Sequence, residues 1–297
     1  MRCLIVGCGY VGLPLGAELV RQGHEVFGLR RGASAKNELK AAGIRPLVAD
    51  ITQPESLVNL PRDFDWVVNC VASGGGSADD YRKMYLEGNH NLIAWLADSP
   101  PEIFVYTSST SVYGQNDGSV VTENSPVEPE ADTAKVLVEA EKSLLAAVAD
   151  RKVPAVILRV AGIYGPGRSH WFRQFLKGEV RIEGDGSRWL NMIHCDDVVG
   201  CVIAALERGQ PGEIYNAADN EPVTQSEFFE WLAVELKRPL PPRIPADADI
   251  RRKRGATNKR VSNAKLRTEL KYKFRFPDFR RGYAAEIAKW SADGSSA

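Results

Sequence analysis

The chain has 297 residues, enough to bury a large core in one domain or in two smaller ones. Lysine plus arginine and aspartate plus glutamate each number 38, so the formal net charge is zero. This balance argues against a nucleic-acid-binding protein that works through a large positive field. No stretch approaches the roughly 18 uninterrupted apolar residues of a membrane span, and a glycine loop stands where a signal peptide needs a longer apolar region. We therefore expect a cytoplasmic protein that binds small molecules and neither nucleic acid nor membranes.

The chain has five cysteines, an odd number, and they lie mostly in apolar runs without the spacing of metal ligands. They are Cys3, Cys8, Cys70, Cys195 and Cys201. We interpret them as reduced, partly buried thiols, and we expect neither disulfides nor a bound metal.

Six short apolar runs predict buried strands. They span 4–6, 25–29, 46–49, 66–71, 103–106 and 155–158. Stretches with helical spacing separate several of them, at 13–22, 81–97 and 133–149. Strand and helix alternating in this way predict right-handed crossovers, and hence an α/β fold with a doubly wound parallel sheet.

The pattern becomes irregular after about residue 162, where glycine and proline turns indicate a smaller appended lobe. Helical spacing returns at 195–206 and a strand pattern at 212–216, so the chain is expected to revisit the main sheet. The sequence thus predicts a nucleotide-binding domain at 1–162 and about 194–218. A substrate-binding lobe would comprise about 163–193 and 219–297. The basic run at 251–254 is interpreted as a solvated face, and the tail at 293–297 as frayed.

A glycine loop directly follows the first predicted strand and opens the first predicted helix. Its residues are Gly7, Cys8, Gly9, Tyr10, Val11 and Gly12. In the G-x-G-x-x-G pattern the first glycine makes the tight turn, the second lets the backbone approach phosphate, and the third lets helix pack on strand. Helix N-terminal amides then face the anion. This loop predicts a Rossmann-type site for the pyrophosphate of a nicotinamide dinucleotide.

The end of the second strand bears on the choice between NADP and NAD. An acid there binds the ribose 2′-hydroxyl, whereas an arginine accommodates a 2′-phosphate. Here the residues are Arg30 and Arg31, which favour NADP, with NAD as the alternative if the arginines only cap an exposed strand end. After the third strand, Asp50 is a candidate acceptor for the adenine amino group, and Ile51 a candidate packing surface for the ring.

At this point the chain resembles the extended short-chain dehydrogenase/reductases, a family of NAD(P)-dependent sugar-nucleotide epimerases, dehydratases and reductases. Motifs in a shared order along most of the chain carry the likeness: the glycine loop, Cys70 to Ser73, Thr107 to Gly114, Leu158 to Gly167, Ile193 to Val198, and Tyr215-Asn216. The resemblance implies that Val71, Ala72 and Ser73 contact the cofactor. It also implies a small-molecule substrate such as a sugar nucleotide, and a homodimer.

The resemblance further implies that Ser109 is the substrate-orienting hydroxyl, with Thr107, Ser108 or Ser111 as substitutes. Local hydrogen bonding to the backbone is an equal alternative for that serine. In active members a tyrosine and a lysine lie four apart on the next helix, where the lysine binds the nicotinamide ribose and the tyrosine transfers a proton. Lys135 matches the lysine, for both the catalytic and the cofactor-binding role, with an ordinary solvated helix residue as the alternative. Ala131, however, stands four residues earlier. A methyl group transfers no proton, so this departure separates cofactor binding from catalysis.

Two tyrosines at strand exits, Tyr113 and Tyr164, are candidates to replace the missing acid, with packing as their alternative. In the second lobe, arginines beside aromatic residues, among them Arg168, either clamp an anionic substrate or pack the lobe. His194 is interpreted as structural.

Two hypotheses follow from these residues. The first is an NADP(H)-dependent oxidoreductase or epimerase-like enzyme that uses a substitute acid or substrate-assisted proton transfer. The second is a non-catalytic NADP(H)-binding sensor or scaffold that has lost the tyrosine.

Overall fold

The computed structural model describes residues 1–73, 76–245 and 257–292. Its centre is a seven-stranded sheet in which every pairing is parallel, with the order β12-β7-β5-β4-β1-β2-β3. The strands are β1 Arg2–Val6, β2 Glu25–Arg30, β3 Arg45–Val48, β4 Trp66–Asn69, β5 Ile103–Ser109, β7 Ala155–Val160 and β12 Ile214–Ala217. The predicted doubly wound α/β fold is confirmed. Each apolar run became a strand because both faces of the sheet are covered.

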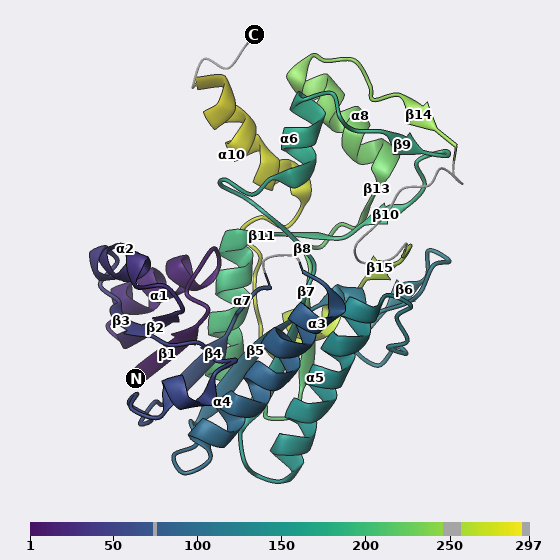
Figure 1. Ribbon diagram of the computed structural model, residues 1–297. Coiled ribbons are helices and arrows are strands. Elements are labelled where there is room, and N and C mark those ends of the chain that lie inside the picture. Colours follow the sequence, from purple (N-terminus) through teal and green to yellow (C-terminus); the bar gives the residue numbers. More distant parts are fainter. Residues whose placement is uncertain (74–75, 246–256, 293–297) are drawn as a thin grey trace.

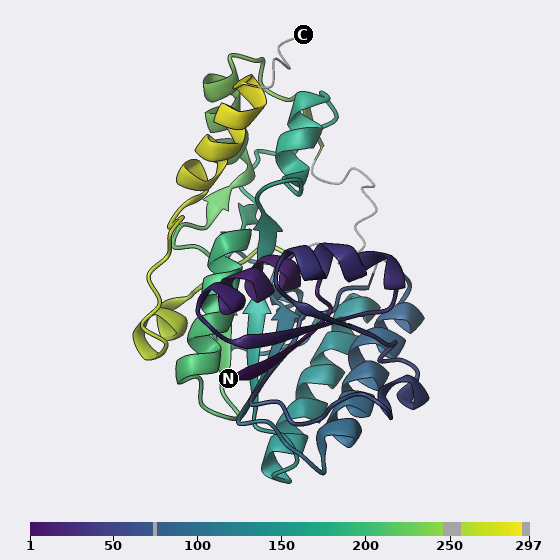
Figure 2. The same ribbon diagram turned by 90° about the vertical axis from the view of Figure 1, so that its left-hand side faces the viewer.

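Helices lie on both faces of this sheet (Figures 1 and 2). They are α1 Gly12–Arg21, α2 Lys36–Ala41, α3 Ala78–Tyr81, α4 Gly88–Leu96, α5 Asp132–Ala149 and α7 Cys195–Arg208. A π-helical segment, η3 Arg82–Glu87, joins α3 to α4, and 3-10 turns occupy Ala33–Ala35, Pro54–Leu57 and Thr110–Val112. Within the described residues, no helix is long and apolar enough to span a membrane.

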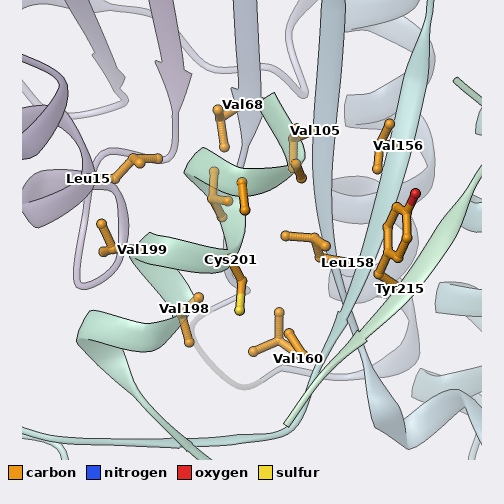
Figure 3. Packing of buried hydrophobic residues seen from close by; sticks show 14 of the residues in the cluster. Leu15, Val68, Val105, Val156, Leu158, Val160, Val198, Val199, Cys201 and Tyr215 are labelled. Carbon is orange, nitrogen blue, oxygen red and sulfur yellow. The ribbon is translucent and has the colours of Figure 1, made fainter. Parts of the chain in front are cut away.

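The sheet core is aliphatic and is closed on one face by α7. Figure 3 shows Val198 and Cys201 of this helix in the same cluster as Val105 and Leu158 of the central strands. Both helix residues are fully buried. Burial of such side chains contributes roughly 1.5–3 kcal/mol each, so the residues after the irregular stretch are an integral part of the sheet domain.

A second lobe stands above the carboxyl ends of the strands (Figure 1). Its elements are α6 His170–Leu176, β9 Ile182–Glu183, β10 Trp189–Leu190, β13 Val223–Thr224, α8 Gln225–Leu236, β14 Arg243–Ile244 and α10 Phe279–Ala292. The parallel pair β8 Gly162–Tyr164 and β11 Met192–His194 connects it to the sheet. Its core is aromatic, with Phe228, Phe229, Phe279 and Tyr283 fully buried.

The C-terminal part of the chain departs from the predicted boundaries. β15 Arg260–Val261 pairs with β6 Val120–Val121, and α9 Ala264–Glu269 packs against β12. Leu266 and Leu270 join the core of the main sheet. The assignment of all of 219–297 to the second lobe is therefore wrong for residues around 260–270. The runs at 251–254 and 293–297 lie outside the described residues.

Candidate dinucleotide-binding site

A cavity of about 510 Å³ opens at the carboxyl ends of the strands, where β1 separates β2 on one side from β4 on the other. In open α/β sheets this switch point is where ligands bind. Most of the residues predicted to bind the cofactor or substrate line it: Gly7, Gly9, Tyr10, Val11, Arg30, Arg31, Asp50, Ile51, Val71, Ala72 and Ser109. We call the part at the ends of β2 and β3 the β2–β3 half, and the part at the ends of β4 and β5 the β4–β5 half.

The three glycines of the loop have different surroundings. Gly7 has a positive φ of 83°, and a Cβ atom there would lie 2.6 Å from the Cα of Val71. A Cβ on Gly12 would lie 2.7 Å from the carbonyl oxygen of Gly7, so Gly12 serves helix packing and does not line the cavity. A Cβ on Gly9 would meet only the Gly7 oxygen, 3.9 Å away. The space over Gly9 is thus open to a ligand.

The first turn of α1 faces this open space without a protein cap. Its N-cap residue, Val11, makes no side-chain hydrogen bond to the helix, and the first turn carries no acid. Uncapped amides and the positive end of the helix dipole favour an anion. The loop therefore fits a pyrophosphate.

In the β2–β3 half, the two arginines differ in their partners. The Nη1 of Arg30 lies 2.8 Å from Oε2 of Glu38. Arg31 also lines the cavity but forms no ion pair with any residue that the structure describes. Asp50 accepts hydrogen bonds at Oδ1 from both the backbone and the hydroxyl of Thr52, at 3.0 and 2.8 Å. Arg31 is thus the cation left for a ligand here.

The β4–β5 half carries hydroxyl groups at the end of β5. Oγ of Ser109 accepts a hydrogen bond from the backbone of Ser111 at 3.2 Å and keeps its own proton available. The hydroxyl of Ser108 instead donates to buried Glu141 at 2.6 Å. Ser73, a predicted cofactor contact, is not among the lining residues; its backbone N–H donates to the Tyr85 hydroxyl at 2.9 Å.

Lys135, predicted to bind the nicotinamide ribose, is not among the residues that line the cavity. Its Nζ lies 2.9 Å from Oδ1 of Asp132, and the side chain is 54% exposed. The lining residue from α5 is Leu137, two positions later. At 3.6 residues per turn, two positions differ by about 200°, which places Lys135 on the opposite face of the helix. Ala131 is the N-cap residue, with an extended backbone.

The position one turn before Leu137 on the same face of α5 is Thr133. Thr133 and Leu137 are thus the pair four apart on the face of α5 that carries the lining residue Leu137.

The two candidate substitute acids do not line the cavity. Tyr113 is fully buried; its hydroxyl donates to Oδ1 of Asn216 and accepts from Nη1 of Arg159, both at 2.8 Å. Burial raises the pKa of this phenol against the opposing charge of Arg159. Tyr164 is 2% exposed and stacks on Tyr283 at 4.5 Å, and burial raises its pKa far above the ordinary range. Both therefore pack the fold.

The hydroxyl of Tyr113 belongs to a buried network beside the cavity. Nη2 of Arg159 and Oε2 of Glu141 form an ion pair of 2.7 Å, and both side chains are under 5% exposed. Because Glu141 also accepts from Ser108, this network fixes the end of β5 that carries Ser109.

Three lining residues come from the segment after β4 and were not predicted: Tyr81, Met84 and Tyr85. Met84 and Tyr85 lie three and four positions after Tyr81, so all three lie on one helical face. This spacing can be read from the sequence alone. Tyr85 belongs to the π-helical segment, a geometry that is frequent at functional sites.

Arg168 also lines the cavity, from the second lobe. His194 is buried and caps α7, with its Nδ1 accepting from the backbone of Asp196 at 3.2 Å.

The comparisons with known proteins agree with this geometry. The model of the NAD dependent epimerase/dehydratase family matches residues 3–218. Protein YeeZ from Escherichia coli K12 is 28% identical over 289 residues, covering 93% of this chain and 97% of YeeZ. A solved structure from Methylobacillus flagellatus, itself named for that family, is 33% identical, with a TM-score of 0.78 over 98% of both chains.

The dTDP-glucose 4,6-dehydratase DesIV from Streptomyces venezuelae, solved with NAD bound, is 21% identical. It has a TM-score of 0.83 and covers 99% of this chain and 98% of its own. At that identity the likeness shows the shared fold.

Proposed function

Since the chain belongs to the NAD dependent epimerase/dehydratase family, we propose that it is an NADP(H)-dependent oxidoreductase or epimerase-like enzyme. One observation carries the choice of NADP(H): Arg31 lines the β2–β3 half of the cavity without an ion-pair partner in the described chain. A 2′-phosphate there gains a charge-assisted hydrogen bond. The neighbouring Arg30 is already paired with Glu38, so Arg31 is the principal discriminating residue.

Thermal unfolding with NADPH and with NADH tests this proposal. A ligand that binds only the folded state stabilises it by about 2.7 kcal/mol at one hundred times its dissociation constant. We expect a larger shift with NADPH. Arg31→Gln should weaken NADPH at least tenfold and change NADH less than twofold. Arg45→Gln, an exposed arginine on β3 outside the cavity, should change neither. An equal shift with both dinucleotides would contradict the NADP preference.

The proposed substrate is a small molecule with a carbonyl group or a secondary alcohol. Sugar nucleotides are the first class to test, because DesIV is a dTDP-glucose dehydratase. A bound nicotinamide would accept or supply the hydride. The chain would contribute Oγ of Ser109, which is placed at the end of β5 to orient the substrate oxygen.

The proton would be held at the hydroxyl of Tyr85. This residue lines the cavity, and its oxygen accepts from the N–H of Ser73, so its own proton is left to donate. Removal of a positioned general acid costs roughly 10²–10⁴ in rate. Tyr85→Phe should lower kcat by that factor and leave NADPH affinity within twofold.

A second candidate function is a non-catalytic NADP(H)-binding sensor or scaffold. Leu137 favours it, since this apolar side chain lines the cavity from the helix where active relatives are expected to present a lysine. The two functions differ in turnover. Cofactor oxidation by the wild type across a panel of carbonyls and sugar nucleotides supports the enzyme. If the wild type oxidises no cofactor with any compound of the panel, and the double variant Thr133→Tyr/Leu137→Lys does, the result supports the non-catalytic sensor.

A further inference from the structure

The second lobe reaches the glycine loop through one turn. Arg168 follows the turn at Gly165–Gly167 and lines the cavity, with its guanidinium carbon 5.1 Å from the centre of the Tyr10 ring. Tyr10 is itself part of the glycine loop. The guanidinium therefore lies beside the loop whose amides face the pyrophosphate position.

This turn is built rigidly against the loop. The carbonyl oxygen of Gly165 accepts from the backbone of Arg168 at 3.0 Å and from the hydroxyl of buried Ser169 at 3.1 Å. A Cβ on Gly165 would lie 3.2 Å from the hydroxyl oxygen of Tyr10. The close packing fixes where the backbone of Arg168 stands relative to the glycine loop.

The charges around the loop are unbalanced for a pyrophosphate. That group carries two negative charges, whereas a helix N-terminus supplies about half a positive charge. The glycine loop contains no basic residue. Arg168 makes no ion pair with the residues that the structure describes, and Arg30 is paired with Glu38. Arg168 is thus a cation without an ion-pair partner in the described chain, and it lies against the Tyr10 ring of the loop.

We propose that Arg168 of the second lobe binds the pyrophosphate of the dinucleotide, so that the cofactor bridges the two lobes. The inference rests on the proposed function only in that a nicotinamide dinucleotide must bind. It gives Arg168 a different target from Arg31: the phosphates common to NADPH and NADH, and not the 2′-phosphate. Binding free energy is thereby shared between the sheet domain and the lobe that would hold the substrate.

Direct binding measurements separate the two arginines. Arg168→Gln should weaken NADPH and NADH alike, by tenfold or more, because both lose the same charge-assisted contact. It should leave 2′-AMP, which has a 2′-phosphate and no pyrophosphate, within twofold of the wild type. Arg31→Gln should show the reverse pattern, with NADPH and 2′-AMP weakened and NADH retained. Arg168→Lys, which keeps the charge but not the fork, should recover part of the affinity.

Arg173→Gln is the matched control. Arg173 lies one turn further along, donates to the carbonyl of Gly167 at 3.3 Å, and does not line the cavity. It should bind both dinucleotides as the wild type does, and all variants should unfold within about 2 °C of it, since exposed substitutions change stability little.

Three results would overturn the inference. The first is an unchanged affinity of Arg168→Gln for both dinucleotides. If the KM for the substrate rises in the same variant, Arg168 binds an anionic substrate instead. A loss confined to NADPH and 2′-AMP would assign Arg168 to the 2′-phosphate. A wild type that binds neither dinucleotide would remove the proposed function as well, which distinguishes that failure from the first two.

Discussion

Lys135 and Leu137 stand two positions apart on α5 and face opposite sides of the helix. The lysine pairs with Asp132 in solvent, whereas the leucine is buried and lines the cavity. The side of α5 that meets a bound ligand therefore carries no cation at this turn.

Lys135→Ala tests this placement. Exposed ion pairs contribute about 0–1 kcal/mol, so the variant should keep its unfolding free energy within that range and its NADPH affinity within twofold. Fluorescence titration and urea unfolding measure the two quantities. A tenfold loss of NADPH affinity would show instead that Lys135 binds the cofactor.

Gly9 and Gly12 should respond oppositely to alanine. Gly9→Ala projects a methyl group into open space above the loop, so the protein should fold normally and lose NADPH and NADH affinity at least tenfold. Gly12→Ala forces a methyl to 2.7 Å from the Gly7 carbonyl and should lower the unfolding free energy by about 1–3 kcal/mol. Thermal unfolding with and without dinucleotide checks both. Normal binding by Gly9→Ala would argue against a phosphate at this position.

Tyr113→Phe should act on stability and not on the reaction. Loss of the hydroxyl leaves Oδ1 of Asn216 and Nη1 of Arg159 without this partner in a buried site. An unsatisfied buried polar group costs about 1–3 kcal/mol. Urea unfolding should register that loss, with NADPH affinity unchanged. Tyr85→Phe, in the cavity, is the matched variant. If Tyr113→Phe lost turnover and kept its stability, Tyr113 would be the acid in place of Tyr85.

Asp219 makes stability depend on pH. Its side chain is 2% exposed, Oδ1 accepts from the backbone of Glu221, and Oδ2 has no partner among the described residues. Burial raises the pKa of this carboxyl well above its ordinary value. Above the unfolded value of about 3.9 the native state then binds more protons than the unfolded chain, so stability falls as pH rises.

Asp219→Asn removes that dependence. Its urea midpoint should exceed that of the wild type at pH 7, and the difference should vanish near pH 3, below both pKa values. Exposed Asp185 is the control of opposite sign, because its hydrogen bonds from Ser187 lower its pKa and favour the charged form. A gain for Asp219→Asn that is equal at both pH values would point to packing and not to charge.

The sheet was predictable because its central strands β1, β4, β5 and β7 are largely apolar runs that the covering helices bury. The return of residues 260–270 to that sheet was not. β6 and β15 are two residues long each, and a pair this short has no periodicity of its own. Leu266 and Leu270 have helical spacing, but spacing alone does not tell which core a helix joins.

In the site, the predicted residues that line the cavity are mostly those with a local sequence signal. The contacts of Gly7 to Gly12 follow from a strand, a turn and a helix in immediate succession. The face of α5 that meets the cavity has no such signal, because a long irregular connection precedes this helix and no neighbouring residue fixes its rotation. Arg168 reaches the site from the other lobe, and that approach depends on the packing of Gly165 against Tyr10.

The return of the C-terminal segment to β12 also affects how the protein is made. The core of the sheet domain includes Leu266 and Leu270, which are synthesised after most of the second lobe. Domains generally fold as units as the chain emerges from the ribosome. Here the sheet domain cannot complete its core until residues 260–270 are available, after α6 and α8 of the second lobe have been translated.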